Sequence, residues 1–283
     1  MTKFAVTVIS PPGYVHTAAF YEVAESIHFG LVALGYDSVL TTNANLPGRQ
    51  HIILGSNILP AYPLPLAPNA ILYNLEQVDP NSSWFRPELV ALLAKYRVWD
   101  YSQTNVVALE ALGVKVERVV PIGYVKELTR INFASHRDID VLFFGSMNPR
   151  RQEIIQRLRS SGLQVAAVFG IYGQQRDALI ARSKLLLNVH FYEAKVLEIV
   201  RISYLLANRC AILSESSSNP LEDASFADGV AFEEYGNLEK TAHQLINDAE
   251  RRNRLSQQGF ELMRERLMSD YLHAALDGFS TPS

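Results

Sequence analysis

The chain has 283 residues, of which 48% are hydrophobic, and a formal net charge of -3. That length suffices for two modest domains with separate cores, and the lack of a basic excess argues against a nucleic-acid partner. The one cysteine, Cys210, excludes a disulfide framework and a cysteine-rich zinc site and favours a reducing cytoplasm. The N-terminal residues lack a signal-peptide pattern, and no run of about 18 apolar residues offers a membrane span. We therefore expect a cytoplasmic protein.

The first part of the chain alternates short apolar strands with helices. An opening strand at residues 4–9 leads through a loop into a helix over residues 17–34, which Gly35 ends. The alternation continues to about residue 119, and this is the pattern of a parallel, doubly wound sheet. The further strands are predicted at residues 38–40, 51–54, 70–74, 98–100 and 115–119, with helices near 86–94 and 103–112.

Residues 121–137 break the pattern, and a strand at 139–144 opens a second series. We predict an α/β protein of two Rossmann-like domains, residues 1–125 and 126–283, which face each other across a cleft. The second series has predicted strands at 164–169, 185–189, 210–213 and 229–232, and helices after Asn148, at 174–183, at 194–207 and from 237 onward.

A charged stripe interrupts the most apolar stretch of the second series. The helix predicted over residues 194–207 is apolar nearly all round, which indicates burial, yet Glu198, Arg201 and Tyr204 share one face of it. Two interpretations stay open. The stripe is either a structural Glu198–Arg201 pair that fixes the helix or a polar face directed at a ligand.

The segment before this helix favours the ligand interpretation. A buried strand at 185–189 ends just before His190, Tyr192 and Glu193. Ligands of open parallel sheets bind beyond the carboxyl ends of the strands, where these side chains would project.

The entry to the second series has the features of an anion site. Gly145 and Ser146 follow the strand, Asn148 can cap the next helix, and Arg150 and Arg151 lie in its first turn. Two cations there oppose the helix dipole, whereas a bound diphosphate would reverse the sign of that interaction. The alternative is a pair of exposed arginines on a solvated helix face.

The loop after the first strand contains Gly13, Tyr14 and His16 but no GxGxxG, and no P-loop occurs in the chain. This argues against a dehydrogenase or a kinase. His16 is our first candidate for a general base near neutral pH, and a polar loop histidine without that role is the alternative.

A second loop at the same sheet edge clusters acidic and amide side chains, among them Asn74, Glu76 and Gln77. Glu76 is the second candidate base or a ligand for an acceptor hydroxyl, and the alternative is a loop acid without either role. No metal centre is predicted, because the Asp138 to Asp140 motif precedes its strand and the histidines lack metal-ligand spacing.

Three stretches together carry a family resemblance. Residues 140–146 with Arg150 and Arg151, residues 188–193, and residues 206–215 after Glu198 and Arg201 look like the donor domain of GT-B-fold glycosyltransferases. The bacterial group 1-like and spore-maturation CgeB-like branch is the most similar. The resemblance covers residues 138–265, and it extends to the first half only through its architecture and residues 73–77.

The resemblance implies a nucleotide-sugar donor held by the second domain, an acceptor held by the first, no cofactor and no essential metal. The implied donor contacts are Gly145, Ser146, Asn148, Arg150, Arg151, His190, Tyr192, Glu193, Glu198 and Arg201. The candidate acceptor contacts are Gly13, Tyr14, Asn74 and Gln77. The acceptor would be a saccharide or a lipid-linked hydroxyl compound, and the latter would allow weak peripheral membrane contact.

Two departures from the family pattern matter for mechanism. Many retaining members have two glutamates separated by seven residues, but Arg201 stands at that spacing from Glu193 and Tyr204 where the second glutamate would align. The retaining or inverting outcome is therefore open. Arg209 occupies a position where the family has a small residue.

We expect a metal-independent glycosyltransferase of bacterial cell-surface glycan or glycoconjugate assembly. The alternatives are a non-catalytic scaffold with a degenerate GT-B fold and a sugar-nucleotide epimerase or hydrolase.

Overall fold

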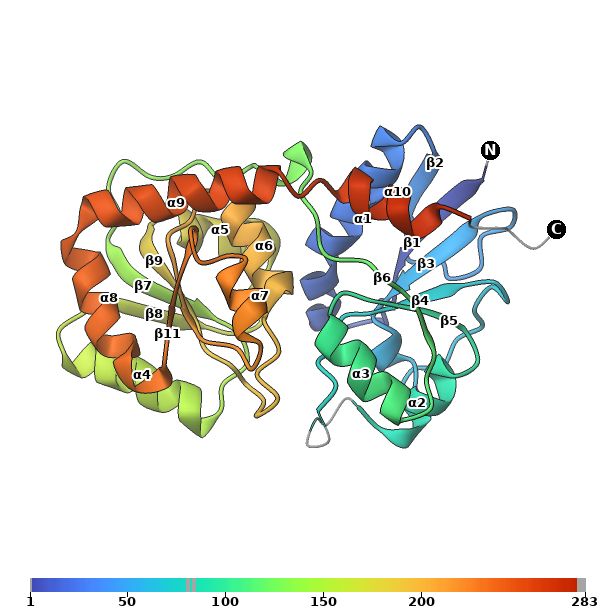
Figure 1. The fold of residues 1–283 in the computed structure, drawn as a ribbon, viewed down its shortest axis with the longest axis horizontal. Helices are drawn as coiled ribbons and strands as arrows, with labels where there is room; N and C mark the ends of the chain where they lie inside the picture. Colours follow the sequence, from blue (N-terminus) through green and yellow to red (C-terminus); the bar gives the residue numbers. More distant parts are fainter. Residues whose placement is uncertain (1, 80–81, 83–84, 279–283) are drawn as a thin grey trace. The chain divides into compact units, whose positions relative to one another are not determined.

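The computed structural model describes residues 2–79, 82 and 85–278 and divides the chain into two compact units, each built on its own sheet (Figure 1). The first unit comprises Met1–Val125 with Arg266–Ser283, and the second comprises Lys126–Glu265. Strands alternate with helices in both, and every strand pair in the described chain is parallel. The predicted α/β class with two Rossmann-like sheets is therefore confirmed.

The first unit contains a six-stranded sheet in the order β2-β1-β3-β4-β5-β6. Its inner strands are buried along nearly their whole length, which explains why they are continuous apolar runs rather than alternating ones. The strands are β1 (Lys3–Val8), β2 (Asp37–Thr41), β3 (Gln50–Leu54), β4 (Ile71–Asn74), β5 (Arg97–Asp100) and β6 (Val116–Val119).

The helices of the first unit follow the predicted positions, with one difference at the start. The helix expected over residues 17–34 begins as a separate 3-10 helix and becomes α-helical only at Tyr21. These elements are η1 (Val15–Phe20), α1 (Tyr21–Ala33), η2 (Ser56–Ile58), α2 (Pro87–Leu93), α3 (Gln103–Ala111) and α10 (Met268–Leu276).

The second unit contains a five-stranded sheet in the order β11-β10-β9-β7-β8. Its core joins Val141 of β7 and Leu185 of β9 to Ile154 and Leu158 of the helix that follows β7. The strands are β7 (Ile139–Phe144), β8 (Val165–Val168), β9 (Ser183–Asn188), β10 (Ile212–Glu215) and β11 (Val230–Glu233).

The helices of the second unit differ from the prediction mainly before the charged stripe. The predicted helix over 194–207 begins only at Ile199, and a short helix begins at Pro220, between the strands predicted at 210–213 and 229–232. These elements are η3 (Lys126–Leu128), α4 (Pro149–Ser160), α5 (Gly173–Ala181), α6 (Ile199–Ala207), α7 (Pro220–Ala224), η4 (Tyr235–Asn237), α8 (Leu238–Asn247) and α9 (Ala249–Arg264).

The C-terminal segment differs from the predicted domain of residues 126–283, because the chain rejoins the first unit at Arg266. Met268 and Leu272 of α10 are buried there, and a Cβ at Gly30 of α1 would lie 2.8 Å from Leu272 Cδ1. The backbone also joins the two segments, since Tyr124 N donates to Arg266 O at 2.7 Å. A helix pattern in the sequence marks α10 but does not say which core it covers.

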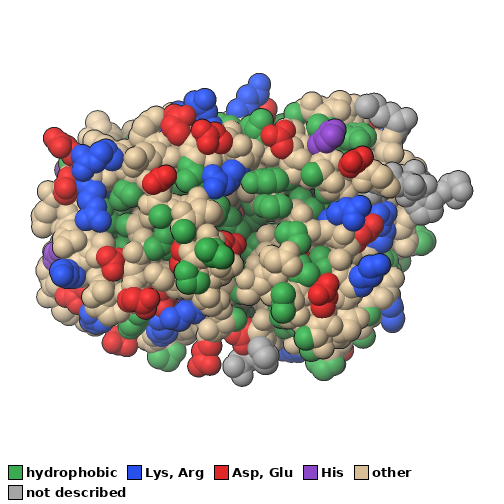
Figure 2. Space-filling view, in the orientation of Figure 1, with side chains coloured by type: hydrophobic (Ala, Val, Ile, Leu, Met, Phe, Trp, Pro, Cys, Tyr) green, Lys and Arg blue, Asp and Glu red, His purple; other side chains and the backbone are tan. Residues whose placement is uncertain are grey.

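The surface carries basic and acidic side chains interspersed on the face seen in Figure 2. None of the helices in the described part of the chain is long and apolar enough to cross a membrane.

Candidate functional site

The topology of the second sheet marks one edge as the place for a ligand. After β7 the chain builds β8 on one side and then returns to build β9 on the other. Loops that leave the carboxyl ends of such strands diverge, and the crevice between them is the usual binding position in parallel sheets. The segments that follow β7 and β9 and the last residue of β10 all contribute charged side chains there.

The loop from β7 into α4 is shaped by Gly145 and Asn148. Gly145 has φ 147°, and a Cβ at this position would lie 2.9 Å from Arg201 Nη2, so the backbone conformation and the close approach both require glycine. The Asn148 side chain accepts from Arg151 N at 2.8 Å as the predicted cap, and its Nδ2 donates to Phe191 O at 3.1 Å. The loop is thereby tied to the segment after β9.

Arg151 is a buried clamp. Its side chain is 3% exposed, and it donates to Val189 O at 2.7 Å, to Ser146 O at 2.9 Å and to Glu198 Oε1 at 2.8 Å. Burial lowers the pKa of Arg151 to about 10, although the Glu198 carboxylate opposes this. The guanidinium therefore holds the β7–α4 loop and both ends of the β9–α6 segment together, and it is not positioned as an exposed phosphate ligand.

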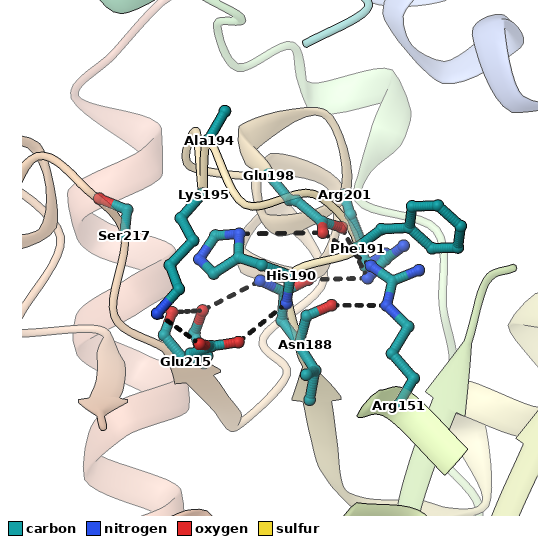
Figure 3. Close-up of polar contacts among 12 residues, drawn as sticks. Arg151, Asn188, His190, Phe191, Ala194, Lys195, Glu198, Arg201, Glu215 and Ser217 are labelled. Carbon is teal, nitrogen blue, oxygen red and sulfur yellow. Dashed lines mark hydrogen bonds and ion pairs between the residues drawn. The ribbon is translucent and has the colours of Figure 1, made fainter. Parts of the chain in front are cut away.

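Glu198 joins Arg151 to Arg201 (Figure 3). Arg201 Nη1 lies 2.9 Å from Glu198 Oε2 and donates to Asn188 Oδ1 at 2.7 Å. Burial favours the neutral acid, but the two guanidinium groups outweigh it and lower the pKa of Glu198. The predicted Glu198–Arg201 pair exists, whereas the Tyr204 hydroxyl instead donates to Asp177 Oδ2 at 2.8 Å.

A second carboxylate, Glu215 at the end of β10, gathers two more cations. Arg150 donates to it in a bidentate pair and packs over the Tyr235 ring at 4.0 Å, and Lys195 Nζ lies 3.0 Å from Glu215 Oε1. Glu215 is 1% exposed, while the side chains of Arg150 and Lys195 are 33% and 35% exposed. Burial raises the pKa of Glu215, but the hydrogen bonds from both cations prevail and lower it.

His190 lies between the two carboxylates (Figure 3). Its backbone N donates to Glu215 Oε2 at 3.1 Å, and its Nδ1 lies 4.0 Å from Glu198 Oε1. Neither ring nitrogen has a hydrogen-bond partner among the described residues, and the ring is 1% exposed. Burial lowers the pKa of His190 despite the two nearby carboxylates, which favours the neutral imidazole.

The charges of this cluster do not cancel. Arg150, Arg151, Lys195 and Arg201 give four positive charges against the two negative charges of Glu198 and Glu215, which leaves a formal charge of +2. A dianionic group would balance that charge, and the partly exposed cations are the ones able to reach it. We call these six side chains with His190 the cation cluster.

Several of the donor-site residues predicted from the sequence therefore do lie together in the cation cluster, but two members of the cluster were not predicted. Ser146 contributes a backbone carbonyl, whereas Glu193 is exposed and Tyr192 packs edge-on against Phe191 with ring centroids 4.9 Å apart. Lys195 and Glu215 were not predicted as site residues. Glu215 could have been predicted, because a glutamate at the end of an apolar strand is unusual. Lys195 could not, because it has φ 45° in a segment whose sequence is typical of a helix.

The corresponding edge of the first sheet gathers the other predicted residues. The chain builds β2 on one side of β1 and β3 on the other, so the loops after β1 and β3 diverge at this edge. The segments after β1, β3 and β4 contain Tyr14, Asn57 and Glu76 respectively. Asn57 Nδ2 donates to Glu76 Oε1 at 3.0 Å, and burial raises the pKa of Glu76 to about 7. Burial and then the Glu76 carboxylate raise the pKa of Tyr14, which places both groups at one location.

The remaining predicted residues of this edge have different environments. His16 is half-buried and packs edge-on against Tyr14 at 5.4 Å, and Gly13 is exposed with φ 76°. Asn74 is buried and donates to Asp100 Oδ2 at 2.7 Å, so its amide is committed to shaping the loop. Gln77 is buried, and its Oε1 has no hydrogen-bond partner among the described residues.

No group of three or more His, Cys, Asp or Glu side chains in the described chain could hold a metal ion. The Asp138 to Asp140 motif is used for ion pairs, because Asp138 pairs with Arg182 and Asp140 lies 2.7 Å from Lys184 Nζ.

Comparison with other sequences gives relatives without a stated activity. No protein-family model matches the chain. Two uncharacterized proteins of Acanthamoeba polyphaga mimivirus are similar to it: one is 34% identical over 132 residues, 46% of this chain and 15% of that protein. The other is 26% identical over 193 residues, 64% of this chain and 60% of that protein. The chain thus spans only part of the length of both relatives.

Solved structures are similar along nearly the whole chain. HepE from Anabaena, solved with UDP and glucose, has a TM-score of 0.64 at 12% identity, covering 99% of this chain and 100% of that one. Sucrose-phosphate synthase from Thermosynechococcus elongatus has a TM-score of 0.61 at 11% identity with the same coverage. WaaG, a glycosyltransferase involved in lipopolysaccharide biosynthesis, has a TM-score of 0.58 at 11% identity, again covering 99% and 100%.

These similarities establish the fold of this chain as that of GT-B glycosyltransferases. The predicted CgeB-like branch stays a prediction.

Proposed function

We propose that the protein is a glycosyltransferase that uses a nucleotide-sugar donor bound by the second unit and an acceptor hydroxyl bound by the first. The cation cluster carries this proposal, because its formal charge of +2 at the carboxyl edge of the sheet matches the two charges of a diphosphate. The protein shares its fold with HepE, which was solved with UDP, and this supports a nucleotide sugar as the donor.

Among the predicted donor residues, some are placed to contact the donor and others hold the loops of the site in position. Arg150, Lys195 and Arg201 are the cations with exposed surface, and we assign them to the diphosphate. Arg151 is buried and positions the loops, so its predicted role as a direct ligand is replaced by a positioning role. His190, Tyr192, Glu193 and Glu198 remain candidates for the sugar or the nucleoside.

The reaction places specific demands on these groups. The bond between the anomeric carbon and the diphosphate oxygen breaks, the acceptor oxygen bonds to that carbon, and the acceptor proton passes to a base. Negative charge develops on the departing diphosphate, and fixed cations in a partly buried site stabilise it. Arg150, Lys195 and Arg201 supply that charge.

We favour Glu76 over His16 as the base. A carboxylate whose pKa burial raises to about 7 can accept a proton near neutral pH, and Asn57 fixes its orientation at 3.0 Å. Replacing Glu76 with Gln should lower turnover by about 10²-fold or more, and replacing His16 with Gln should lower it less. The reverse ranking in single-turnover measurements would restore His16 as the first choice.

Transfer should not need a divalent cation, since the cation cluster itself can neutralise the leaving group. We expect full activity after treatment with EDTA and no stimulation by added manganese. Activity that EDTA abolishes and manganese restores would contradict this part of the proposal.

The biological setting proposed is the transfer of sugar to a saccharide or lipid-linked acceptor in bacterial cell-surface glycan or glycoconjugate assembly, in the cytoplasm and with weak peripheral membrane contact. Support comes from the resemblance and from WaaG, which has the same fold and is involved in lipopolysaccharide biosynthesis.

The decisive experiment measures nucleotide binding and donor turnover with matched arginine variants. Arg150→Gln removes a cluster cation but leaves Lys195 to pair with Glu215. Arg157→Gln is the control, because Arg157 lies on the same helix, pairs with Glu239 at 3.0 Å and is similarly exposed at 35%. We expect Arg150→Gln to weaken nucleoside diphosphate binding tenfold or more and Arg157→Gln to leave it unchanged.

Binding is first screened by thermal shift, because a ligand at a hundred times its dissociation constant stabilises the folded state by about 2.7 kcal/mol. Slow release of nucleoside diphosphate from donor sugars without acceptor then tests the chemistry. A scaffold protein would release none, and an epimerase or hydrolase would form its product with no acceptor added. Equal nucleotide affinity in the two variants would show that the donor does not bind at the cation cluster.

A further inference from the structure

A second cationic cavity lies at the other edge of the second sheet. It has a volume of about 410 Å³, and its lining residues include Ser135, Arg137, Lys184, Arg209, Arg252 and Ser256. Arg137 precedes β7, Lys184 lies near the start of β9, and Arg209 precedes β10. The cavity is therefore at the amino ends of the strands, whereas the cation cluster is at their carboxyl ends.

The lining of this cavity concentrates positive charge. Arg137, Lys184, Arg209 and Arg252 face it, and none of its described lining residues carries a carboxylate. Two acidic side chains that do not line the cavity interact with these cations: Asp140 Oδ1 is 2.7 Å from Lys184 Nζ, and the Asp248 carboxylate opposes the lowering of the Arg252 pKa by burial. Four cations against these two carboxylates leave a formal charge of +2.

Two of these arginines, Arg137 and Arg252, repel each other electrostatically. Burial lowers the pKa of Arg137; Cys210 opposes this shift, and repulsion from Arg252 adds a smaller lowering. Arg252 is held in place by donating to Leu245 O and Ile246 O at 2.5 and 2.6 Å, so it cannot relax away without losing both bonds. Convergence of like charges in a partly buried space costs free energy, which a bound anion would offset.

Arg209 adds an independent observation. It has φ 54°, the left-handed region that glycine occupies without penalty and that costs other residues about 1 kcal/mol or more. Its guanidinium lies over the Phe260 ring at 3.5 Å and borders the cavity. An arginine therefore stands where the backbone favours glycine, and it lines the same cavity as the other three cations.

We propose that this cavity is a second ligand site of the protein and binds a compact, multiply charged anion carrying a diphosphate group. Its volume lies within the range of small-molecule sites, about 300–1,000 Å³. Ser135 and Asn253 add neutral hydrogen-bond donors to the four cations, which is the mixture that phosphate oxygens accept. The proposal does not depend on the function assigned to the cation cluster.

The diphosphate group could belong to free pyrophosphate or to a nucleotide, and the cation cluster could bind either one. The test therefore uses Arg150→Gln as its background, in which binding at the cation cluster is expected to be tenfold or more weaker than in the wild type. Calorimetric titration of this variant with inorganic pyrophosphate should still show one binding event. A parallel titration with UDP distinguishes the sources: binding of both assigns the site to the diphosphate group in general, and binding of pyrophosphate alone assigns it to the free anion.

Variants of the cavity then locate the binding event. Adding Arg137→Gln should weaken pyrophosphate binding tenfold or more. The matched control is Arg254→Gln, because Arg254 lies on α9 two residues from Arg252, is 62% exposed and does not line the cavity. That control should leave the affinity unchanged.

The Arg209→Gly variant tests whether weaker pyrophosphate binding could be caused by loss of folding. Glycine suits the backbone at φ 54°, so the melting temperature should not fall, while pyrophosphate binding should weaken about fivefold or more. The inference is overturned if the Arg150→Gln background binds no pyrophosphate, or if Arg137→Gln, Arg209→Gly and Arg254→Gln all bind it equally. These outcomes differ from failure of the proposed function, which is judged by nucleotide binding to Arg150→Gln against Arg157→Gln and by release of nucleoside diphosphate from donor sugars.

Discussion

Arg150 and Arg151 are adjacent in the sequence but have opposite environments. Arg150 is 33% exposed and pairs with Glu215, whereas Arg151 is 3% exposed and donates to two backbone carbonyls and Glu198. Successive helical residues point about 100° apart, so one reaches the site surface and the other the interior. The sequence predicted that both would meet an anion, because a charge pattern does not reveal which helix face is covered.

Glu198 separates structural from catalytic effects at a single position. Replacement with Ala leaves the buried guanidinium of Arg151 without its carboxylate and should cost about 3–5 kcal/mol of unfolding free energy. Glu198→Gln keeps one oxygen acceptor and should cost less, about 1–2 kcal/mol. Urea unfolding of both variants measures this difference.

The same Glu198→Gln sample tests the donor role. If the side chain contacts the donor, single-turnover rates should fall about a hundredfold while most stability remains. A large loss of stability with a near-normal rate would mean that Glu198 only supports the arginines.

Glu76 predicts an unusual pH dependence of stability. Its pKa rises to about 7 on folding from 4.5, so the folded state holds the proton more tightly than the unfolded state. The resulting stabilisation is fully present below about pH 4.5 and is lost as the pH rises towards 7. Asp100, whose pKa burial raises to about 7, acts in the same direction.

Glu76→Gln should therefore flatten this dependence. Between pH 5 and 8 the wild type should lose about 1–3 kcal/mol more stability than the variant does. Denaturant unfolding at both pH values measures the difference, with exposed Glu110→Gln as the control for removing a carboxylate from the same unit. Parallel curves for wild type and Glu76→Gln would show that the buried carboxyl does not titrate in this range.

At the scale of elements, strands were more predictable than the segments that carry the site. The strand predicted at 139–144 is found at Ile139–Phe144, since a continuous apolar run in a parallel sheet has few alternatives. Residues 194–198 have helical composition but are not helical. Ser218 explains this: its N donates to Lys195 O at 3.0 Å and its Oγ to Ala194 O at 2.7 Å, contacts from a distant loop that local sequence cannot reveal.

The loop between β7 and α4 can be tested through its glycine. Gly145→Ala should cost about 1–3 kcal/mol because φ is 147°, and its Cβ would displace Arg201, whose Nη2 lies 2.9 Å away. Nucleoside diphosphate binding should then weaken about tenfold. Gly162→Ala is the matched control, because it follows the same helix at φ 94° with nothing within 4 Å of the added carbon.

Calorimetry on the two variants distinguishes backbone strain from displacement of Arg201. Equal stability losses with a loss of affinity only in Gly145→Ala support the site. Equal affinities would show that the close approach at Gly145 serves packing alone.

At the scale of the whole molecule, the C-terminal segment makes the first unit discontinuous in sequence. The chain leaves this unit after Val125 and returns at Arg266, where Met268 N donates to Tyr124 O at 3.0 Å. Met268 and Leu272 are at most 1% exposed, and burying side chains of this size stabilises by about 1.5–3 kcal/mol each. This sum is a large fraction of a typical domain stability of about 5–15 kcal/mol.

A chain shortened to end at Glu265 should therefore lose stability in the first unit and keep it in the second. Hydrogen exchange should show lost amide protection in β1 to β6 and retained protection in β7 to β11. A chain that ends at Gly278 keeps α10 and serves as the control. The second unit includes both proposed anion sites, so pyrophosphate should still bind the shortened protein. Protection that falls equally in both sheets would contradict the division into units, because it would mean that α10 supports the two cores alike.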